Sequence, residues 1–229
     1  MASKKIISLP ELENRVHVFR DRNHAGRILA DMTKADMDEN FILLAIPAGG
    51  VPVALAISSE LGLVFDIAAV SKITLPWNSE AGYGAVAFDG TIRLNKPLMA
   101  RLNLTDRQVN EGIENTREKV ARRNTALRGE RPLLLLSGKT AVIVDDGLAS
   151  GFTMLCAIDA VKNSGADKVM AAVPTAHMRA AETVAQKVDR LYCPNIRGGI
   201  SFAVAEAYEN WYDISEKELL TMLERHLKG

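Results

Sequence analysis

The chain has 229 residues, of which 48% are hydrophobic and 24% are charged, values typical of an ordinary globular domain with enough apolar side chains for a full core. Lys and Arg together number 28, as do Asp and Glu, so the formal net charge is zero. This balance argues against a non-specific nucleic-acid binder, because such proteins need surplus positive charge to displace counterions.

The first fifteen residues, MASKKIISLPELENR, lack the long apolar stretch of a signal peptide. No run elsewhere approaches the roughly 20 apolar residues that a membrane span needs. Cys156 and Cys193 lie far apart and outside any C-x-x-C pair, so we expect two reduced thiols. The sequence therefore predicts a cytoplasmic protein without a membrane partner, and its four scattered histidines show no zinc spacing.

Short apolar runs alternate with longer helix-like stretches along most of the chain. The apolar runs cover residues 41–47, 64–70, 141–144 and 169–173, and the helix-like stretches cover residues 25–35, 51–61, 151–163 and 176–187. Strands that are apolar throughout are buried on both faces, and their alternation with helices indicates βαβ units. We predict an α/β fold with an open, mostly parallel, twisted sheet flanked by helices.

Two segments depart from this alternation. Residues 72–95 are rich in Gly, Pro and polar residues and carry a hairpin signal at Asp89–Gly90, and a charged helix over residues 105–128 follows, with a capping box at Thr105. After Asp189 a strand-like run leads to a terminal helix from about Ser215. We predict one domain over residues 1–229, with a core at about 15–190, an inserted hairpin and helix at about 72–130, and a small C-terminal cap at about 191–229.

The strongest chemical signal is the run AVIVDDGLASGFT over residues 141–153. A buried strand ends in Asp145 and Asp146, and a loop of small residues then opens a helix. Ligands of open α/β sheets bind at the carboxyl ends of the strands. The loop would present backbone N–H groups and the hydroxyls of Ser150 and Thr153 at a helix N-terminus, which favours a phosphate group.

Two carboxylates beside a phosphate site would repel the ligand unless they contact hydroxyl groups or a metal ion. A ribose 5-phosphate supplies both hydroxyls and phosphate, because Asp145 and Asp146 can accept hydrogen bonds from its 2- and 3-hydroxyls while the loop holds the phosphate. Mg²⁺ would bridge the hydroxyls and a pyrophosphate, as a hard ion prefers oxygen ligands. The same Asp pair occurs in phosphate-accepting receiver domains and metal-dependent phosphatases, which need further acids or a lysine at other strand ends.

The run V-D-D-G-L-A-S-G-F-T resembles the phosphoribosyl-pyrophosphate signature of type I phosphoribosyltransferases. Gly147 stands where an aliphatic residue is common, and Ala149 stands where Thr or Ser is common. The resemblance implies that Asp145 and Asp146 are catalytic and hold Mg²⁺ indirectly, through ribose hydroxyls and water. It implies that the donor is bound by the loop residues Gly147, Leu148, Ala149, Ser150, Gly151, Phe152 and Thr153.

The run Ile46-Pro47-Ala48-Gly49-Gly50-Val51-Pro52 resembles the pyrophosphate loop of the same enzymes. Two consecutive glycines let backbone amides approach a diphosphate closely. The resemblance implies pyrophosphate binding by Ala48, Gly49 and Gly50, and a catalytic role for Lys72 after the second strand. Competing nucleotide motifs are absent from the sequence: there is no G-x-x-x-x-G-K-[ST], and Gly82-Tyr83-Gly84 lacks a third glycine.

The resemblance extends to a subgroup of small, stand-alone bacterial and archaeal phosphoribosyltransferase-domain proteins. It is carried by the two loops, by Arg20-Asp21-Arg22, Ala25-Gly26-Arg27, Lys72 and Gly84-Ala85-Val86, and by the late run A-V-A-E-A-Y. Ala48 and Ser71 stand where this subgroup usually has Arg, so Lys72, Arg93 or a neighbouring subunit would supply the missing charge. Residues 72–95 correspond to a mobile loop over the site, which we expect Trp77, Tyr83 and Phe88 to anchor to the body.

These likenesses imply a Mg²⁺-dependent enzyme of nucleotide metabolism, a homodimer that transfers the 5-phosphoribosyl group of phosphoribosyl pyrophosphate to a small-molecule acceptor and releases pyrophosphate. The acceptor, a nucleobase or another amine, would bind within residues 193–210. There, residues 194–199 either contact it through Arg197 or backbone groups or form a plain loop. Two alternatives stay open. One is a non-catalytic regulator that senses phosphoribosyl pyrophosphate, and the other is a phosphate-ester hydrolase that uses the Asp pair.

Overall fold

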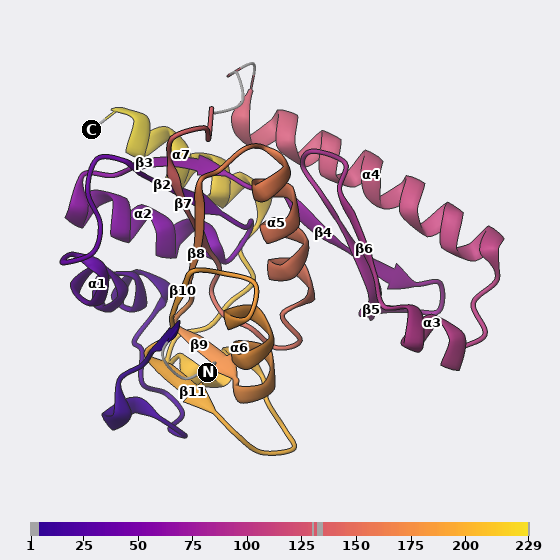
Figure 1. Ribbon diagram of the computed structural model, residues 1–229, viewed down its shortest axis with the longest axis horizontal. Helices are drawn as coiled ribbons and strands as arrows, with labels where there is room; N and C mark the ends of the chain where they lie inside the picture. The colour runs from indigo at the N-terminus through magenta and orange to yellow at the C-terminus, as the bar shows by residue number, and fades with distance from the viewer. Residues whose placement is uncertain (1–4, 130, 132–134, 229) are drawn as a thin grey trace.

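A six-stranded, wholly parallel sheet forms the centre of the protein (Figure 1). The computed structural model describes residues 5–129, 131 and 135–228. The strand order is β3-β2-β7-β8-β10-β1. The strands are β1 (Ile6–Ile7), β2 (Phe41–Ala45), β3 (Val64–Ile67), β7 (Thr140–Val144), β8 (Lys168–Ala172) and β10 (Arg190–Tyr192).

Helices cover both faces of this sheet, as Figure 1 shows. One face packs against α1 (Arg22–Thr33), α2 (Gly50–Leu61) and α7 (Glu216–Lys228), and the other against α5 (Phe152–Asn163) and α6 (Met178–Ala185). Successive strand residues point to opposite faces, so Leu43 of β2 joins the first core and Leu44 the second. Because both faces are buried, the strands are apolar throughout, and the predicted α/β fold is confirmed.

The element boundaries differ from the predictions where local hydrogen bonds decide them. Helix α1 begins at Arg22 rather than residue 25, because the Asp21 side chain accepts the His24 N–H at 2.7 Å and caps the helix. The helix predicted over 176–187 begins only at Met178, because β9 (Thr175–His177) pairs in parallel with β11 (Asn195–Arg197). The two-residue strand β1 was not predicted, since two residues show no periodicity.

The inserted segment forms an arm that projects from the body (Figure 1). It contains β4 (Val70–Leu75), β5 (Asn78–Ala87), β6 (Ile92–Leu94), α3 (Lys96–Arg101) and α4 (Asp106–Arg128). The predicted hairpin at Asp89–Gly90 is confirmed, with a φ of 87° at Gly90, and so is the capping box at Thr105. The prediction of a loop over residues 72–95 is wrong, because the segment pairs as an antiparallel sheet.

The three aromatic side chains of the arm differ in burial. Tyr83 is buried under α4, where a Cβ on Gly112 would meet its hydroxyl, and Phe88 packs against both cores. Trp77 is 59% exposed at the turn between β4 and β5, so the prediction that it anchors the segment is wrong. Tyr83 therefore stabilises the arm by packing under α4, and Trp77 faces solvent.

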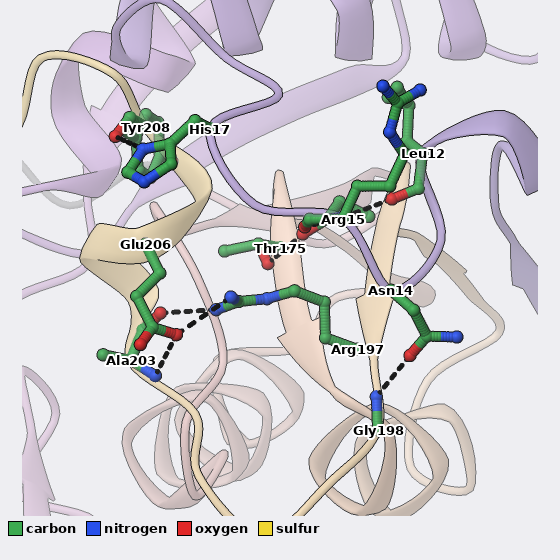
Figure 2. A network of polar contacts seen from close by, with 11 residues as sticks. Leu12, Asn14, Arg15, His17, Thr175, Arg197, Gly198, Ala203, Glu206 and Tyr208 are labelled. Carbon is green, nitrogen blue, oxygen red and sulfur yellow. Dashed lines mark hydrogen bonds and ion pairs between the residues drawn. The ribbon is translucent and has the colours of Figure 1, made fainter.

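A segment near the N-terminus and a segment that follows β10 meet beyond the carboxyl ends of β8 and β10. Residues 9–19, with η2 (Pro10–Leu12), and residues 194–208, with η3 (Val204–Ala207), exchange backbone hydrogen bonds, and we call these two segments the hood. The fully buried Asn195 joins them: its carbonyl oxygen accepts the Thr175 hydroxyl at 2.6 Å, and its amide donates to the carbonyl of Arg15 at 3.1 Å. Figure 2 shows this network.

A buried ion pair attaches the base of the arm to the sheet. Arg128, at the end of α4, contacts both carboxylate oxygens of Asp66 in β3, with its Nη2 2.7 Å from Oδ2 and its Nε 2.9 Å from Oδ1. Both side chains are less than a tenth exposed. Removal of one partner would leave the other charge buried without compensation.

We expect Arg128→Ala to lower the free energy of unfolding by about 3–5 kcal/mol, because the Asp66 carboxylate stays buried without its cation. The matched control is Arg122→Ala on the same helix, whose ion pair with Glu118 is exposed on both sides and should cost about 0.5 kcal/mol or less. Denaturant unfolding of both variants measures the difference. Equal losses would contradict the role given to the buried pair.

Candidate functional site

The candidate site lies where neighbouring strands send their helices to opposite faces of the sheet. Strands β2 and β7 are paired in the middle of the sheet, and α2 leaves β2 on one face while α5 leaves β7 on the other. The loops that follow the two strands therefore lie side by side at the carboxyl ends of the strands, which is where open α/β sheets bind ligands. The first loop is residues 46–50, and the second is residues 145–151.

The first loop packs tightly against the end of β7. A Cβ added at Gly50 would lie 2.4 Å from the Val144 carbonyl oxygen, and one added at Gly49 would lie 1.7 Å from Oδ2 of Asp146. Neither position accepts a side chain without displacement of the loop or the acid. The Pro47–Ala48 peptide bond in this loop is cis. The structure thus brings the predicted pyrophosphate residues Ala48, Gly49 and Gly50 beside the predicted Asp pair.

The two acids have different partners. Oδ2 of Asp146 accepts a hydrogen bond from Nε of Arg22 at 2.9 Å, and its main-chain carbonyl accepts the Tyr208 hydroxyl at 2.7 Å. Oδ1 of Asp145 accepts the N–H of Asp146 at 2.9 Å, and Asp145 forms no ion pair within the described part of the chain. One acid is therefore fixed by a cation, and the other keeps acceptor capacity for a ligand.

Burial sets the charge state of this pair. Burial, and then the neighbouring Asp146 charge, raise the pKa of Asp145 well above the ordinary value of 3.8. Burial also raises the pKa of Asp146, while the Arg22 guanidinium opposes that rise. A ligand that brings hydroxyl donors or a cation to Asp145 would therefore offset the cost of the buried negative charge.

The second loop leads into the first turn of α5. Gly151 has a φ of 72° and is the N-cap of α5, so the N–H groups of the first helical turn have no partner within the helix. The backbone of Leu148 is engaged, since its N–H donates to Thr175 and its carbonyl accepts from His177. Ala149 and Ser150 are exposed, and Phe152 and Thr153 are half-buried. The open face of this loop therefore runs from Ala149 to Thr153.

Gly147 lies under the hood. A Cβ at this position would lie 2.6 Å from Val204 of η3 and 3.0 Å from Thr175. This contact explains the departure from the aliphatic residue that is common in the resembling enzymes, because a larger side chain would push the hood away. The predicted loop residues 147–153 thus follow directly on the acids, with the hood above Gly147 and with Leu148 and Gly151 buried.

The predicted basic residues lie on the arm. Lys72 is an exposed residue of β4 opposite Ala85, with its side chain over Gly82. Arg93 of β6 forms an ion pair with Asp159 of α5 at 2.6 Å, so its charge is compensated there. The buried Ser71 hydroxyl has no hydrogen-bond partner in the described part of the chain. Lys72 is thus an exposed basic residue of the arm, whereas Arg93 is held against α5.

Arg197 points into the hood instead of outward. Its guanidinium donates to Glu206 Oε2 at 2.9 Å and to the Ala203 carbonyl, and it stacks 4.4 Å from the centre of the Phe202 ring (Figure 2 draws its polar contacts). The residue is 5% exposed. It therefore closes the loop 198–203 from inside. The interpretation of residues 194–199 as a plain loop is wrong in part, because Asn195–Arg197 form β11, which pairs with β9.

Two arginines of the site were not singled out from the sequence. Arg22 is buried beside Asp146, although the sequence marked it only as part of the run Arg20-Asp21-Arg22. Arg123 of α4 donates to the carbonyl of Pro47 at 3.5 Å, and burial lowers its pKa. The signal for Arg22 was present, because Asp21 is a good N-cap and the residue after an N-cap starts a helix; nothing local pointed to Arg123.

Comparison with known families identifies the family of this chain. Residues 89–207 match the family model described as "Phosphoribosyl transferase domain". The chain belongs to this family. The matched region contains the acids, the loop 147–153 and most of the hood, so the predicted membership of the phosphoribosyltransferases is confirmed.

Two proteins of Mycobacterium tuberculosis, from strains CDC 1551 / Oshkosh and ATCC 25618 / H37Rv, are each 32% identical to this chain over 209 residues. Both carry the name "Putative phosphoribosyl transferase". The match covers 91% of this chain but 47% of each relative, so the chain spans about half the length of these curated relatives.

Solved structures share the fold. The protein TT1426 of Thermus thermophilus is 28% identical, with a TM-score of 0.74, and the match covers 90% of this chain and 98% of that protein. The protein AQ2163 of Aquifex aeolicus is 13% identical, with a TM-score of 0.51 over 82% of this chain and 78% of that protein. The fold of this phosphoribosyltransferase domain thus matches TT1426 over nearly the full length of that protein.

Two further properties concern the described residues alone. None of the helices within residues 5–129 and 135–228 combines the length and apolarity that crossing a membrane requires. In the same residues, no three His, Cys, Asp or Glu side chains cluster as a metal site would require. A metal ion at the Asp pair would therefore need most of its ligands from a bound substrate or from water.

We expect Asp145→Asn to stabilise the protein at neutral pH. A carboxyl group with a raised pKa stabilises the fold only while it is protonated, and this contribution is lost as the pH rises through the raised pKa. The neutral amide avoids that loss, so the melting temperature at pH 8 should rise by about 2–4 °C, which corresponds to about 1 kcal/mol in a chain of this length. The gain should shrink toward pH 4, and a gain independent of pH would contradict the raised pKa.

We expect Gly49→Ala to destabilise the protein by about 1–3 kcal/mol, because the new Cβ overlaps the Asp146 carboxylate. The matched control is Gly198→Ala, where a Cβ would have only ordinary contacts at 3.7 Å and the change should stay within about 0.5 kcal/mol. Denaturant unfolding compares the two. A neutral Gly49→Ala variant would show that the loop is not held against the acid.

Proposed function

We propose that this chain is a Mg²⁺-dependent phosphoribosyltransferase that moves the 5-phosphoribosyl group of phosphoribosyl pyrophosphate to a nucleobase or another amine and releases pyrophosphate. The observation that carries the proposal is the contact between the Gly49–Gly50 loop and the end of β7. Backbone amides of this loop lie beside the two carboxylates, and the acids are followed in the chain by the N-terminus of α5, a kind of site that favours anions.

Each part of the donor has a partner of suitable chemistry. The 5-phosphate binds the open face of the loop from Ala149 to Thr153, with the Ser150 and Thr153 hydroxyls and the first N–H groups of α5 as donors. The ribose hydroxyls donate to the acids, above all to Asp145. The pyrophosphate lies along Ala48, Gly49 and Gly50, where the missing side chains allow close approach.

The donor set is compatible with Mg²⁺. Carboxylate oxygens are ligands that this hard ion prefers, and it binds proteins through one or two carboxylates together with substrate phosphates. Asp145 and Asp146 would hold it through ribose hydroxyls and water, as the sequence predicted. When bound, the ion neutralises charge on the pyrophosphate leaving group.

The chain's own residues then act by position and charge. The bond between the anomeric carbon and pyrophosphate breaks, the acceptor nitrogen forms a bond to the same carbon, and the nitrogen loses a proton. Asp145 and Asp146 hold the ribose and stabilise the positive charge that develops on it, while the loop amides and Lys72 stabilise the departing diphosphate. Ala48 supplies no charge, so Lys72 is the cation that we assign to this step.

Several finer assignments belong to the same proposal. The acceptor would bind between the acids and the hood, next to the exposed loop 198–203, with Ile200 at its tip. A homodimer in the cytoplasm, with no membrane partner and no role for nucleic acid, is the expected assembly. The zero net charge supports the last point, because the chain has no surplus positive charge.

A thermal-shift experiment tests the donor site. Phosphoribosyl pyrophosphate with Mg²⁺ should raise the melting temperature more than ribose 5-phosphate or pyrophosphate alone, because one ligand engages both loops. At about 100 times its dissociation constant, a ligand adds about 2.7 kcal/mol to the native state. The variant Asp145→Asn/Asp146→Asn should stay folded, lose this shift and lose all turnover, and a normal shift or normal turnover in that variant would contradict the assignment.

Acceptor screening by pyrophosphate release then separates the remaining alternatives. Release in the presence of one amine identifies a transferase. Tight donor binding without release by any acceptor would favour a sensor of phosphoribosyl pyrophosphate. Phosphate release from generic esters, with no preference for the donor, would favour a hydrolase.

A further inference from the structure

Arg22 has three different partners around one guanidinium. Its Nε donates to Asp146 Oδ2 at 2.9 Å, and its Nη1 donates to the carbonyl of Tyr212 at 3.0 Å. The guanidinium carbon lies 3.8 Å from the centre of the Trp211 ring, over its face. Arg22 is 7% exposed, so these contacts are made largely out of water, where they are strongest.

The aromatic and carbonyl partners of Arg22 belong to residues 208–212, which we call the strap. The strap begins at Tyr208, which is buried, stacks on Trp211 at 5.2 Å and donates its hydroxyl to the carbonyl of Asp146 at 2.7 Å. It follows directly on η3 of the hood, whose Val204 covers Gly147. The strap is thus fixed to the Asp pair at two points, through the Tyr208 hydroxyl and through Arg22.

The proposed function gives Arg22 no task of its own, and its place suggests one. Arg22 forms an ion pair with Asp146, the acid that lies against Gly49. Arg22 belongs to α1, outside both donor loops. Resting on the donor site proposed above, we propose that Arg22 is a positioning residue: it holds Asp146 against the Gly49 loop and transmits donor binding to Trp211 of the strap.

Electrostatics supplies the physical link. The donor would bring a diphosphate, ribose hydroxyls and a divalent cation to the corner formed by Gly49 and Asp146. Each of these changes how strongly Asp146 attracts Arg22, because charges interact strongly in a poorly hydrated site. Since the same guanidinium lies on Trp211, a change on one side alters the cation–π contact on the other.

The coupling acts in both directions. If donor binding changes the contact between Arg22 and the strap, then the state of the strap changes donor affinity by the same factor. The strap continues the hood, where the acceptor is proposed to bind, so this path joins the two substrate sites. Arg22 touches no reacting atom, and its role lies in alignment rather than in chemistry.

The fluorescence emission of Trp211 reports directly on its contact with Arg22. The chain contains two tryptophans, Trp77 and Trp211, and Trp77→Phe leaves Trp211 as the sole reporter. Trp77 lies exposed on the arm, outside the site. Mg²⁺-phosphoribosyl pyrophosphate should change the Trp211 emission of this variant in a saturable way, at the concentrations that produce the thermal shift.

Substitution of Arg22 gives the second part of the experiment. In the Trp77→Phe background, Arg22→Gln should abolish the emission change at saturating donor and weaken donor binding by about tenfold or more, the size of one charge-assisted hydrogen bond. Arg22→Lys should restore part of the affinity, because it keeps the charge and loses the planar, stacked geometry. Arg20→Gln is the matched control, since Arg20 is exposed and pairs with Asp21, and it should leave both readouts unchanged.

The outcomes separate the two proposals. If the donor shifts the melting temperature of Trp77→Phe without changing the emission of Trp211, the coupling is overturned and the proposed function stays intact. This comparison does not depend on the folding of an Arg22 variant. Retention of both emission change and affinity in Arg22→Gln would overturn the positioning role. Absence of any donor-induced thermal shift would overturn the donor site and this inference together.

Discussion

The close approach of the Gly49–Gly50 loop to the end of β7 is the constraint on which the site depends. A Cβ at Gly50 would meet the Val144 carbonyl at 2.4 Å, so the loop can lie there only because two glycines follow each other. Parallel pairing of β2 with β7 sets the two strand ends side by side, and the helices that follow leave toward opposite faces. Sheet topology thus sets the two loops side by side, and the two missing side chains let them approach each other closely.

This geometry places negative charge where the protein alone stabilises it incompletely. Asp145 is partly buried beside Asp146, and Arg22 compensates one of the two acids. A fully compensated pair would be more stable but would have no capacity left for a ligand, which is the usual trade-off at functional sites. The single arginine therefore distinguishes the two acids: Asp146 is held by Arg22, and Asp145 is the acid that we propose for substrate contact.

The sequence was most informative where local chemistry and burial agreed. The apolar strands, the Asp pair and the glycine loops could be predicted because a doubly buried strand must be apolar and a phosphate loop must expose backbone amides. It was least informative where distant segments decide the structure. The segment 72–95 becomes a sheet through pairing of β4 with β5 and burial of Tyr83, and the contact of Arg22 with Trp211 joins residues at opposite ends of the chain. No local pattern encodes such a contact.

The hood contains polar residues that stabilise the fold and leave the tip of an adjacent loop exposed. Arg197 is a natural candidate for ligand contact, yet its guanidinium is engaged by Glu206, by the Ala203 carbonyl and by the Phe202 ring. Its contacts fix both ends of the loop 198–203, whose tip stays exposed, while Asn195 ties the same segment to the N-terminal part of the hood. A rigid base with an exposed tip lets the loop sequence vary without loss of the fold. Under the proposed function, acceptor choice would then reside in that tip, whereas donor binding would reside in the loops at the strand ends.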